Sequence, residues 1–143
     1  MRITTKGRYA LRALVNLVDL EDGRTMSIKE ISEKENISPE FLEQLFFKMK
    51  RNGIIESFRG PGGGFKLNQP ADTITVNMVF NAVEEEIQLA PCINCEESKN
   101  SSLCENYESC PTYVVWKEAS TRLIDYFSHV TLDILPSRIK KEV

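Results

Sequence analysis

The residues in this chain with the clearest capacity for chemistry are four cysteines in one short segment. They follow the pattern C-x2-C-x8-C-x5-C, and the rest of the 143-residue chain contains no cysteine. Thiolates at this density are soft ligands that suit zinc or an iron–sulfur cluster. The segment therefore predicts a metal-binding or redox-active loop, with these candidate ligands: Cys92, Cys95, Cys104 and Cys110.

The spacing leaves alternatives open. A structural zinc site normally pairs two closely spaced ligand couples; Cys92 and Cys95 form one, but Cys104 and Cys110 are too far apart, which disfavours zinc. A thiol-rich loop without metal is a second alternative. A thioredoxin-like role is disfavoured because no βαβ pattern flanks the first pair. His129, the single histidine of the sequence, is expected at the surface or at an interface.

Composition and charge limit the class of protein. No run approaches the roughly 18–20 apolar residues of a membrane span, and no export signal precedes the first amphipathic segment, so we expect a cytoplasmic protein. Residues 1–70 carry 12 Lys and Arg against 9 Asp and Glu, whereas residues 71–143 carry 6 against 12. This asymmetry suggests that the first half binds a polyanion. No arrangement of side chains has catalytic logic, so we do not expect an enzyme.

The first half has the pattern of a helix-turn-helix. Apolar residues recur at helical spacing over 8–20, and a second helix is expected after Ser27, which has capping-box spacing to Glu30. After a turn at 35–37, a third helix is expected to begin at Ser38 and to end at Gly53. Such a third helix can enter the major groove of DNA. An ordinary helical hairpin with a charged, solvated face is the alternative.

The candidate DNA-binding residues lie on this third helix and just beyond it. Residues 54–58 and 65–67 are expected to form a hairpin, or wing, whose glycine-rich tip is RGPGGG. A phosphate-cradling nucleotide loop is disfavoured, because that motif requires a following helix. Arg59 is placed to enter a narrow minor groove, and the helix end supplies cations for phosphates. The full set is Ser38, Pro39, Glu40, Phe41, Glu43, Gln44, Lys48, Lys50, Arg51, Arg59, Gly60, Pro61, Gly62 and Gly63.

The second half is expected to contain a fourth helix over about 76–86, a long helix over about 112–129 and a short last helix over about 132–140. The long helix carries an apolar stripe that suits pairing with a second copy of the chain, although packing within one chain is the alternative. We predict a mainly α fold, a winged helix-turn-helix with a two-stranded wing and a long C-terminal dimerisation helix. Its parts are a DNA-binding domain (1–86), a cysteine-rich sensor loop (87–111) and the dimerisation and C-terminal helices (112–143). The stripe comprises Trp116, Ala119, Ser120, Leu123, Ile124, Phe127 and Val130.

Four segments together resemble the IscR-like family of bacterial iron–sulfur-responsive transcription regulators. They are MRITTKGRYAL, ISPEFLEQLF, NGIIESFRGPGGGF and CPTYVVWKE. The resemblance implies a homodimeric winged-helix protein that binds double-stranded DNA, with iron–sulfur assembly proteins as possible further partners. In many members a [2Fe–2S] cluster lies in the loop before the long helix. Other members respond to nitric oxide or cysteine supply, and some bind no cluster.

The resemblance also implies a ligand set. Cys92, Cys104 and Cys110 match the three cluster cysteines of the family, although the interval between the first two is longer than usual. Tyr113 stands where the IscR pattern has a histidine, and Arg8 where some relatives have a carboxylate. Cys95 is the local thiol that can fill the fourth position.

Three functions are consistent with these features of the sequence. The first is a transcription repressor or activator controlled by a [2Fe–2S] cluster. The second is a cluster-free regulator of the same family that responds to thiol chemistry or to a partner. The third is an iron–sulfur carrier or assembly protein.

Overall fold

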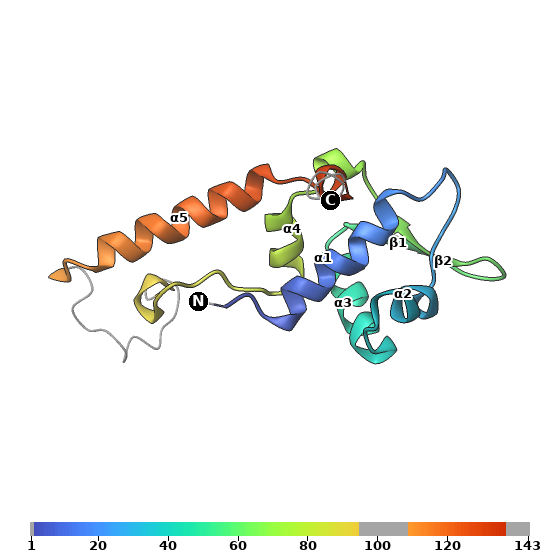
Figure 1. The fold of residues 1–143 in the computed structure, drawn as a ribbon, viewed down its shortest axis with the longest axis horizontal. Helices are drawn as coiled ribbons and strands as arrows, with labels where there is room; N and C mark the ends of the chain where they lie inside the picture. Colours follow the sequence, from blue (N-terminus) through green and yellow to red (C-terminus); the bar gives the residue numbers. More distant parts are fainter. Residues whose placement is uncertain (1, 95–108, 137–143) are drawn as a thin grey trace, which may run out of the picture.

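The chain is mainly helical in the computed structural model, which describes residues 2–94 and 109–136 (Figure 1). The helices are α1 (Thr5–Val18), α2 (Ile28–Glu35), α3 (Pro39–Arg51), α4 (Val76–Ala82) and α5 (Tyr113–His129). Strands β1 (Ile55–Phe58) and β2 (Gly64–Leu67) form an antiparallel pair between α3 and α4. Short 3-10 turns are η1 (Ala71–Thr73), η2 (Pro91–Asn94) and η5 (Leu132–Ile134). The predicted winged helix-turn-helix and long C-terminal helix are confirmed.

Local sequence signals fix the ends of α2 and α3. The Ser27 hydroxyl accepts the backbone N–H of Glu30 at 3.2 Å, and the Glu30 carboxylate accepts the N–H of Ser27 at 2.7 Å. This capping box satisfies two backbone donors that a helix start would otherwise leave unpaired. Asn36 ends α2 in the left-handed region, with φ of 54°. The chain therefore turns sharply enough for α3 to begin three residues later, at Pro39.

The core lies among the first three helices and the wing. The ring of Phe46 on α3 packs edge-on against Phe65 on β2, with ring centroids 4.9 Å apart. Burial of such side chains contributes roughly 1.5–3 kcal/mol each. The fully buried residues that α1, α2 and α3 contribute are Ala10, Ala13, Leu14, Ile31, Leu42, Leu45, Phe46 and Met49.

The long helix α5 begins away from this core and runs back to it (Figure 1). After α5, the carbonyl oxygen of Val130 accepts the N–H of Val76, and the N–H of Leu132 donates to Ile74. Leu132 is fully buried. Within the described residues, no helix is both long and apolar enough to span a membrane. Of the predicted last helix, 132–134 form η5, and residues 137–143 lie outside the described residues.

The fourth helix is shorter than the predicted span of 76–86. It ends at Ala82, and Glu84 follows in the left-handed region with φ of 58°. This reversal turns Glu85 inward, where its side chain is only 5% exposed. The helical pattern gave no sign of the break, because its cause is a contact with the distant start of α1.

Glu85 caps the N-terminus of α1. Its carboxylate accepts the backbone N–H groups of Thr4 and Gly7, each at 3.0 Å, and the Thr4 hydroxyl. The charge also faces the positive end of the helix dipole. Position 7 requires glycine, because a Cβ there would lie only 2.9 Å from Oε2 of Glu85. Burial raises the pKa of Glu85, but the hydrogen bonds from Thr4 and Gly7 outweigh it and leave that pKa below its ordinary value.

We expect Glu85→Gln to lower the free energy of unfolding by about 1–3 kcal/mol at pH 7. Because the folded-state pKa of Glu85 is depressed, its stabilisation is present above the ordinary carboxyl pKa and is lost as the pH falls through the folded-state value. The difference from wild type should therefore shrink as the pH falls from 7 to below 4. Urea unfolding followed by circular dichroism measures it.

The exposed neighbour Glu86 provides the control, and Glu86→Gln should leave stability within about 0.5 kcal/mol of wild type. A stability difference for Glu85→Gln that did not change with pH would contradict the capping role.

Candidate DNA-binding surface and cysteine loop

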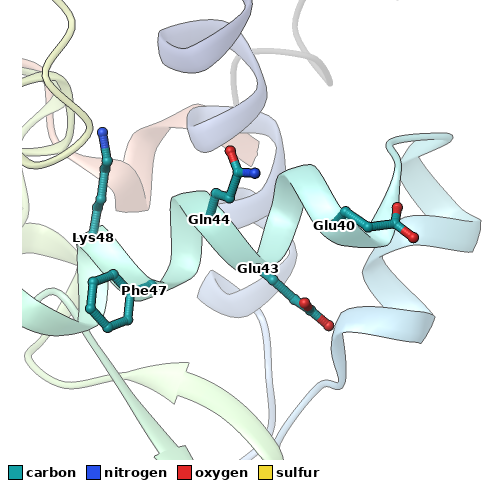
Figure 2. Close-up of a pocket in the computed structure, with 5 residues that line it drawn as sticks. All are labelled: Glu40, Glu43, Gln44, Phe47 and Lys48. Carbon is teal, nitrogen blue, oxygen red and sulfur yellow. The ribbon is translucent and has the colours of Figure 1, made fainter.

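The face of α3 opposite the core is open to solvent. Ser38 caps the helix by accepting the N–H of Phe41 at 3.2 Å, and Pro39 occupies the first helical position. The exposed side chains recur every three to four residues and border a shallow hollow along the helix (Figure 2). The residues that line it are Glu40, Glu43, Gln44, Phe47 and Lys48.

Most of the predicted DNA-binding residues of α3 are exposed, and two are differently placed. Lys50 and Arg51 are exposed at the C-terminal end. Phe41 is half-buried and packs edge-on against Tyr9 of α1, with ring centroids 5.9 Å apart. Lys48 is partly exposed and forms an ion pair with Glu84. Phe41 thus helps hold α3 on α1, and Lys48 joins α3 to the segment after α4.

The tight turn at the tip of the wing depends on glycines. Gly60 and Gly62 have φ of 92° and 74°, in the region that side chains other than glycine rarely adopt. A Cβ at Gly63 would lie 2.5 Å from the carbonyl oxygen of Phe58. The N–H of Gly63 donates to the carbonyl oxygen of Gly60 at 2.9 Å and closes the turn. The tip therefore reverses tightly, with Arg59 exposed beside it.

Contacts with the segment just before α2 hold the wing on the helical body. The Thr25 hydroxyl donates to the carbonyl oxygen of Gly62 at 2.8 Å. Met26 exchanges two backbone hydrogen bonds with Phe65, at 3.0 and 2.8 Å. A Cβ at Gly64 would lie 2.6 Å from the carbonyl oxygen of Met26, so this close approach requires glycine. The wing is thereby fixed relative to α2 and α3.

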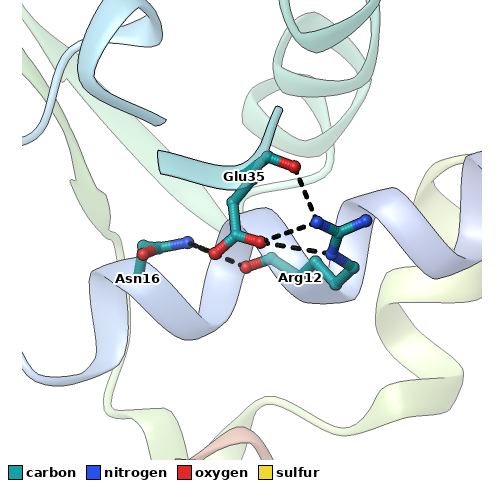
Figure 3. A network of polar contacts seen from close by, with 3 residues as sticks. All are labelled: Arg12, Asn16 and Glu35. Carbon is teal, nitrogen blue, oxygen red and sulfur yellow. Dashed lines mark hydrogen bonds and ion pairs between the residues drawn. The ribbon is translucent and has the colours of Figure 1, made fainter. Parts of the chain in front are cut away.

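A polar network that the sequence analysis did not single out fixes the helix-turn-helix on α1 (Figure 3). Arg12 donates to the Glu35 carboxylate at 3.1 Å and to the Glu35 carbonyl oxygen at 2.6 Å. Asn16 donates to the other carboxylate oxygen at 2.7 Å. Glu35 is the last residue of α2, so these contacts hold the turn that precedes α3. Helical periodicity alone placed Arg12 and Asn16 on a polar stripe and gave no partner.

Two of the four cysteines fall within the described residues. Cys92 lies in η2, and Cys110 lies just before α5; both are free, partly exposed thiols. η2 packs against α5, so the two ends of the cysteine segment lie at one end of the molecule (Figure 1). Cys95 and Cys104 lie outside the described residues.

The surroundings of Cys110 favour its thiolate. Its sulfur lies 3.2 Å from the Thr112 hydroxyl. Hydrogen bonding to the Thr112 side chain, and then to the backbone N–H groups of Thr112 and Tyr113, lowers the pKa of the Cys110 thiol. The thiolate is the form of cysteine that binds metals and attacks disulfides.

Helix α5 divides the predicted apolar stripe between two environments. Phe127 packs edge-on against Phe80 of α4, with centroids 5.3 Å apart, and Ser120 and Val130 are buried. Trp116 and Ile124 remain exposed instead. His129 is exposed, with Nδ1 2.7 Å from the carbonyl oxygen of Asp125. The exposed large apolar side chains of α5 are Val114, Val115, Trp116, Ile124 and Tyr126.

Similar proteins of known sequence are transcriptional regulators. The model of the Rrf2 family, described as iron-dependent transcriptional regulators, matches residues 3–137. The chain is 37% identical to the HTH-type transcriptional regulator IscR of Pectobacterium atrosepticum over 135 residues, which is 94% of this chain and 79% of the relative. It is 35% identical to IscR of Escherichia coli over 132 residues, 92% of this chain and 78% of the relative.

The solved structures of similar fold include other transcriptional regulators. CymR, the global cysteine regulator of B. subtilis, superimposes with a TM-score of 0.74 at 26% identity, over 96% of this chain and 98% of that one. IscR of T. potens gives a TM-score of 0.75 at 22% identity, over 100% and 92%, and supports the fold. The matched proteins are regulators and not enzymes. The chain therefore belongs to the Rrf2 family of transcriptional regulators, which confirms its resemblance to IscR.

Proposed function

We propose that this regulator binds DNA as a homodimer, with α3 of each subunit in the major groove and Arg59 of the wing at the minor groove. The observation that carries the proposal is the open face of α3, set beside a braced wing whose arginine is exposed. Gln44 can bridge adenine, and Glu40 and Glu43 can accept from cytosine N4. The exposed Lys50 and Arg51 suit the flanking phosphates.

The apolar surface of α5 supports the homodimer. Trp116 and Ile124 lie about two helical turns apart on the same side of α5. Both side chains are exposed in the single chain. Exposed apolar groups gathered on one element mark a protein interface more often than scattered ones do. A twofold dimer also matches the symmetry of palindromic DNA sites.

DNA binding is proposed to depend on a [2Fe–2S] cluster held by Cys92, Cys95, Cys104 and Cys110. The donor chemistry fits: the two described members are free thiols at the two ends of one segment, and the lowered pKa of Cys110 favours the thiolate. When bound, the cluster would supply one-electron redox chemistry and sensitivity to iron supply.

The segment between α4 and Cys92 offers a physical link from the cysteine loop to α3. Glu84 forms an ion pair with Lys48 of α3, and its carbonyl oxygen accepts Lys6 Nζ at 2.8 Å. Glu85 caps α1 next to it. A change in the position of Cys92 would act on this segment, and through it on the two helices that place the DNA-binding surface.

A cluster-free regulator that responds to thiol chemistry is the second candidate. It is supported by similarity to the oxidized form of Staphylococcus aureus CymR, with a TM-score of 0.72 at 31% identity over 94% of this chain and 95% of that one. In this case the lowered pKa of Cys110 would favour disulfide exchange instead of metal binding.

Arg59→Ala should weaken binding by about tenfold at sites where the wing meets a narrow, A·T-rich minor groove, because the negative potential is strongest there. Affinities for duplexes that differ only at the wing position measure the effect. Arg122→Ala on α5 removes an equal charge from an exposed position and should bind as wild type does. Equal loss on all duplexes would mean that Arg59 contacts only phosphates.

Protein purified without oxygen should be brown and contain about two iron atoms per chain. Cys92→Ser and Cys110→Ser should lose the iron and the visible spectrum, and Cys95→Ser tests whether this thiol completes the set. Asn94→Ser, in the same turn as Cys92, should keep both. Colourless protein with stoichiometric zinc would contradict the cluster, and metal-free protein with a reversible disulfide would favour the second candidate.

Trp116→Glu should raise the dimer dissociation constant by at least 30-fold, because a buried aromatic anchor typically contributes 2 kcal/mol or more to an interface. Analytical ultracentrifugation over a concentration series measures the change. Thr121→Glu introduces the same charge on the polar side of α5, where Thr121 is exposed, and should remain dimeric. An unchanged dimer in Trp116→Glu would remove α5 as the interface.

A further inference from the structure

One apolar side chain on the DNA-binding face has no structural role in the fold. The ring of Phe47 is 67% exposed, more than any other large apolar side chain in the described part of the chain. Its neighbour Phe46 already fills the core position of this helical turn and is 1% exposed. A second phenylalanine, on the solvent-exposed side of the helix, therefore adds little to the packing of α3.

Phe47 lies among the groups that would face the bases. Figure 2 shows its ring on the same side of α3 as the Glu43 carboxylate, and both border the hollow along the helix. The spacing of four residues places Phe47 about one turn beyond Glu43 along the helix axis. If Glu43 is near base edges in the groove, the ring of Phe47 is near the next base pairs.

We propose that Phe47 contacts the 5-methyl group of thymine in the major groove and makes this protein prefer thymine at one position of each half-site. The thymine methyl is an apolar group presented by a base edge in the major groove, and phenylalanine is a side chain that packs on it. The polar neighbours of Phe47 on α3 contact hydrogen-bonding edges and cannot supply this preference. The inference rests on the proposed binding of α3 in the major groove.

Glu40, Glu43 and Lys48 border the hollow beside Phe47, and it is the cations beyond the hollow that favour DNA over a protein as the occupant of this face. The cations Lys50 and Arg51 lie at the exposed end of the same helix, and Arg59 lies on the adjacent wing. A single ring among charged groups is not the contiguous apolar patch that protein interfaces use. The exposed apolar side chains of α5 form a better protein-binding surface.

Deoxyuridine provides a direct test, because it differs from thymidine only by the methyl group. Bound duplexes are first selected from a random library with the full-length protein, and each thymine of one half-site is then replaced in turn. Wild type should lose roughly fourfold in affinity at one position, the equivalent of one buried methyl group. Phe47→Ser should bind the two duplexes equally, and Phe47→Leu should keep part of the preference.

Thr121→Ser is the control, because Thr121 is exposed on the polar side of α5, away from both α3 and the apolar surface of α5; it should keep the full preference for thymine. Wild-type affinity that is insensitive to every methyl group, or an unchanged preference in Phe47→Ser, would overturn the inference. A change of oligomeric state in Phe47→Ser without a thymine effect would assign the ring to a protein contact and also overturn it. If wild type selects no duplex, the proposed DNA binding itself fails, and the inference with it.

Discussion

The arrangement of the molecule depends on one buried carboxylate. Glu85 lies 78 residues after Gly7 in the sequence, yet it accepts the backbone N–H groups that begin α1. Thr4, at the N-cap position, makes no side-chain cap of its own, so the distant residue satisfies the helix end. A buried negative charge is stable here because several donors and the helix dipole face it. The contact between Glu85 and the start of α1 therefore holds the two ends of the winged domain together. It also fixes the point from which the chain continues toward the cysteines.

Because Glu85 is fixed in place, the ion pair of its neighbour Glu84 with Lys48 connects α3 to a rigid point of the backbone. An exposed pair such as Lys48 and Glu84 typically contributes no more than about 1 kcal/mol to stability. Its value lies in its position, because Glu85 fixes the backbone on one side of Glu84 and α3 carries Lys48. A weak contact between two well-placed elements can shift a balance between two arrangements without threatening the fold. Packing in the core thus determines the stability of the fold, whereas weak contacts such as the Lys48–Glu84 pair can influence the balance between two arrangements.

Local signals carried most of the fold. The Ser27–Glu30 capping box, Ser38 with Pro39, and the glycine-rich tip each act within a few residues, so the sequence predicted α2, α3 and the wing. The early end of α4 was missed because Glu85 is recruited by the distant helix α1. Phe47 was given no role in the sequence analysis for a related reason: in the pair Phe46–Phe47, periodicity assigns one ring to the core but gives the other no partner.

In the proposed function, the contacts that would couple the cysteine segment to α3 lie outside that segment. Glu84, Glu85 and the packing of Phe127 on Phe80 all involve residues that flank the segment 92–110. These contacts are made without a cysteine side chain. This explains how one chain resembles IscR and CymR at once, since those similarities extend over the whole winged domain and α5. On this proposal, the thiols of the segment would determine which signal is sensed, and the contacts that flank the segment would determine the response.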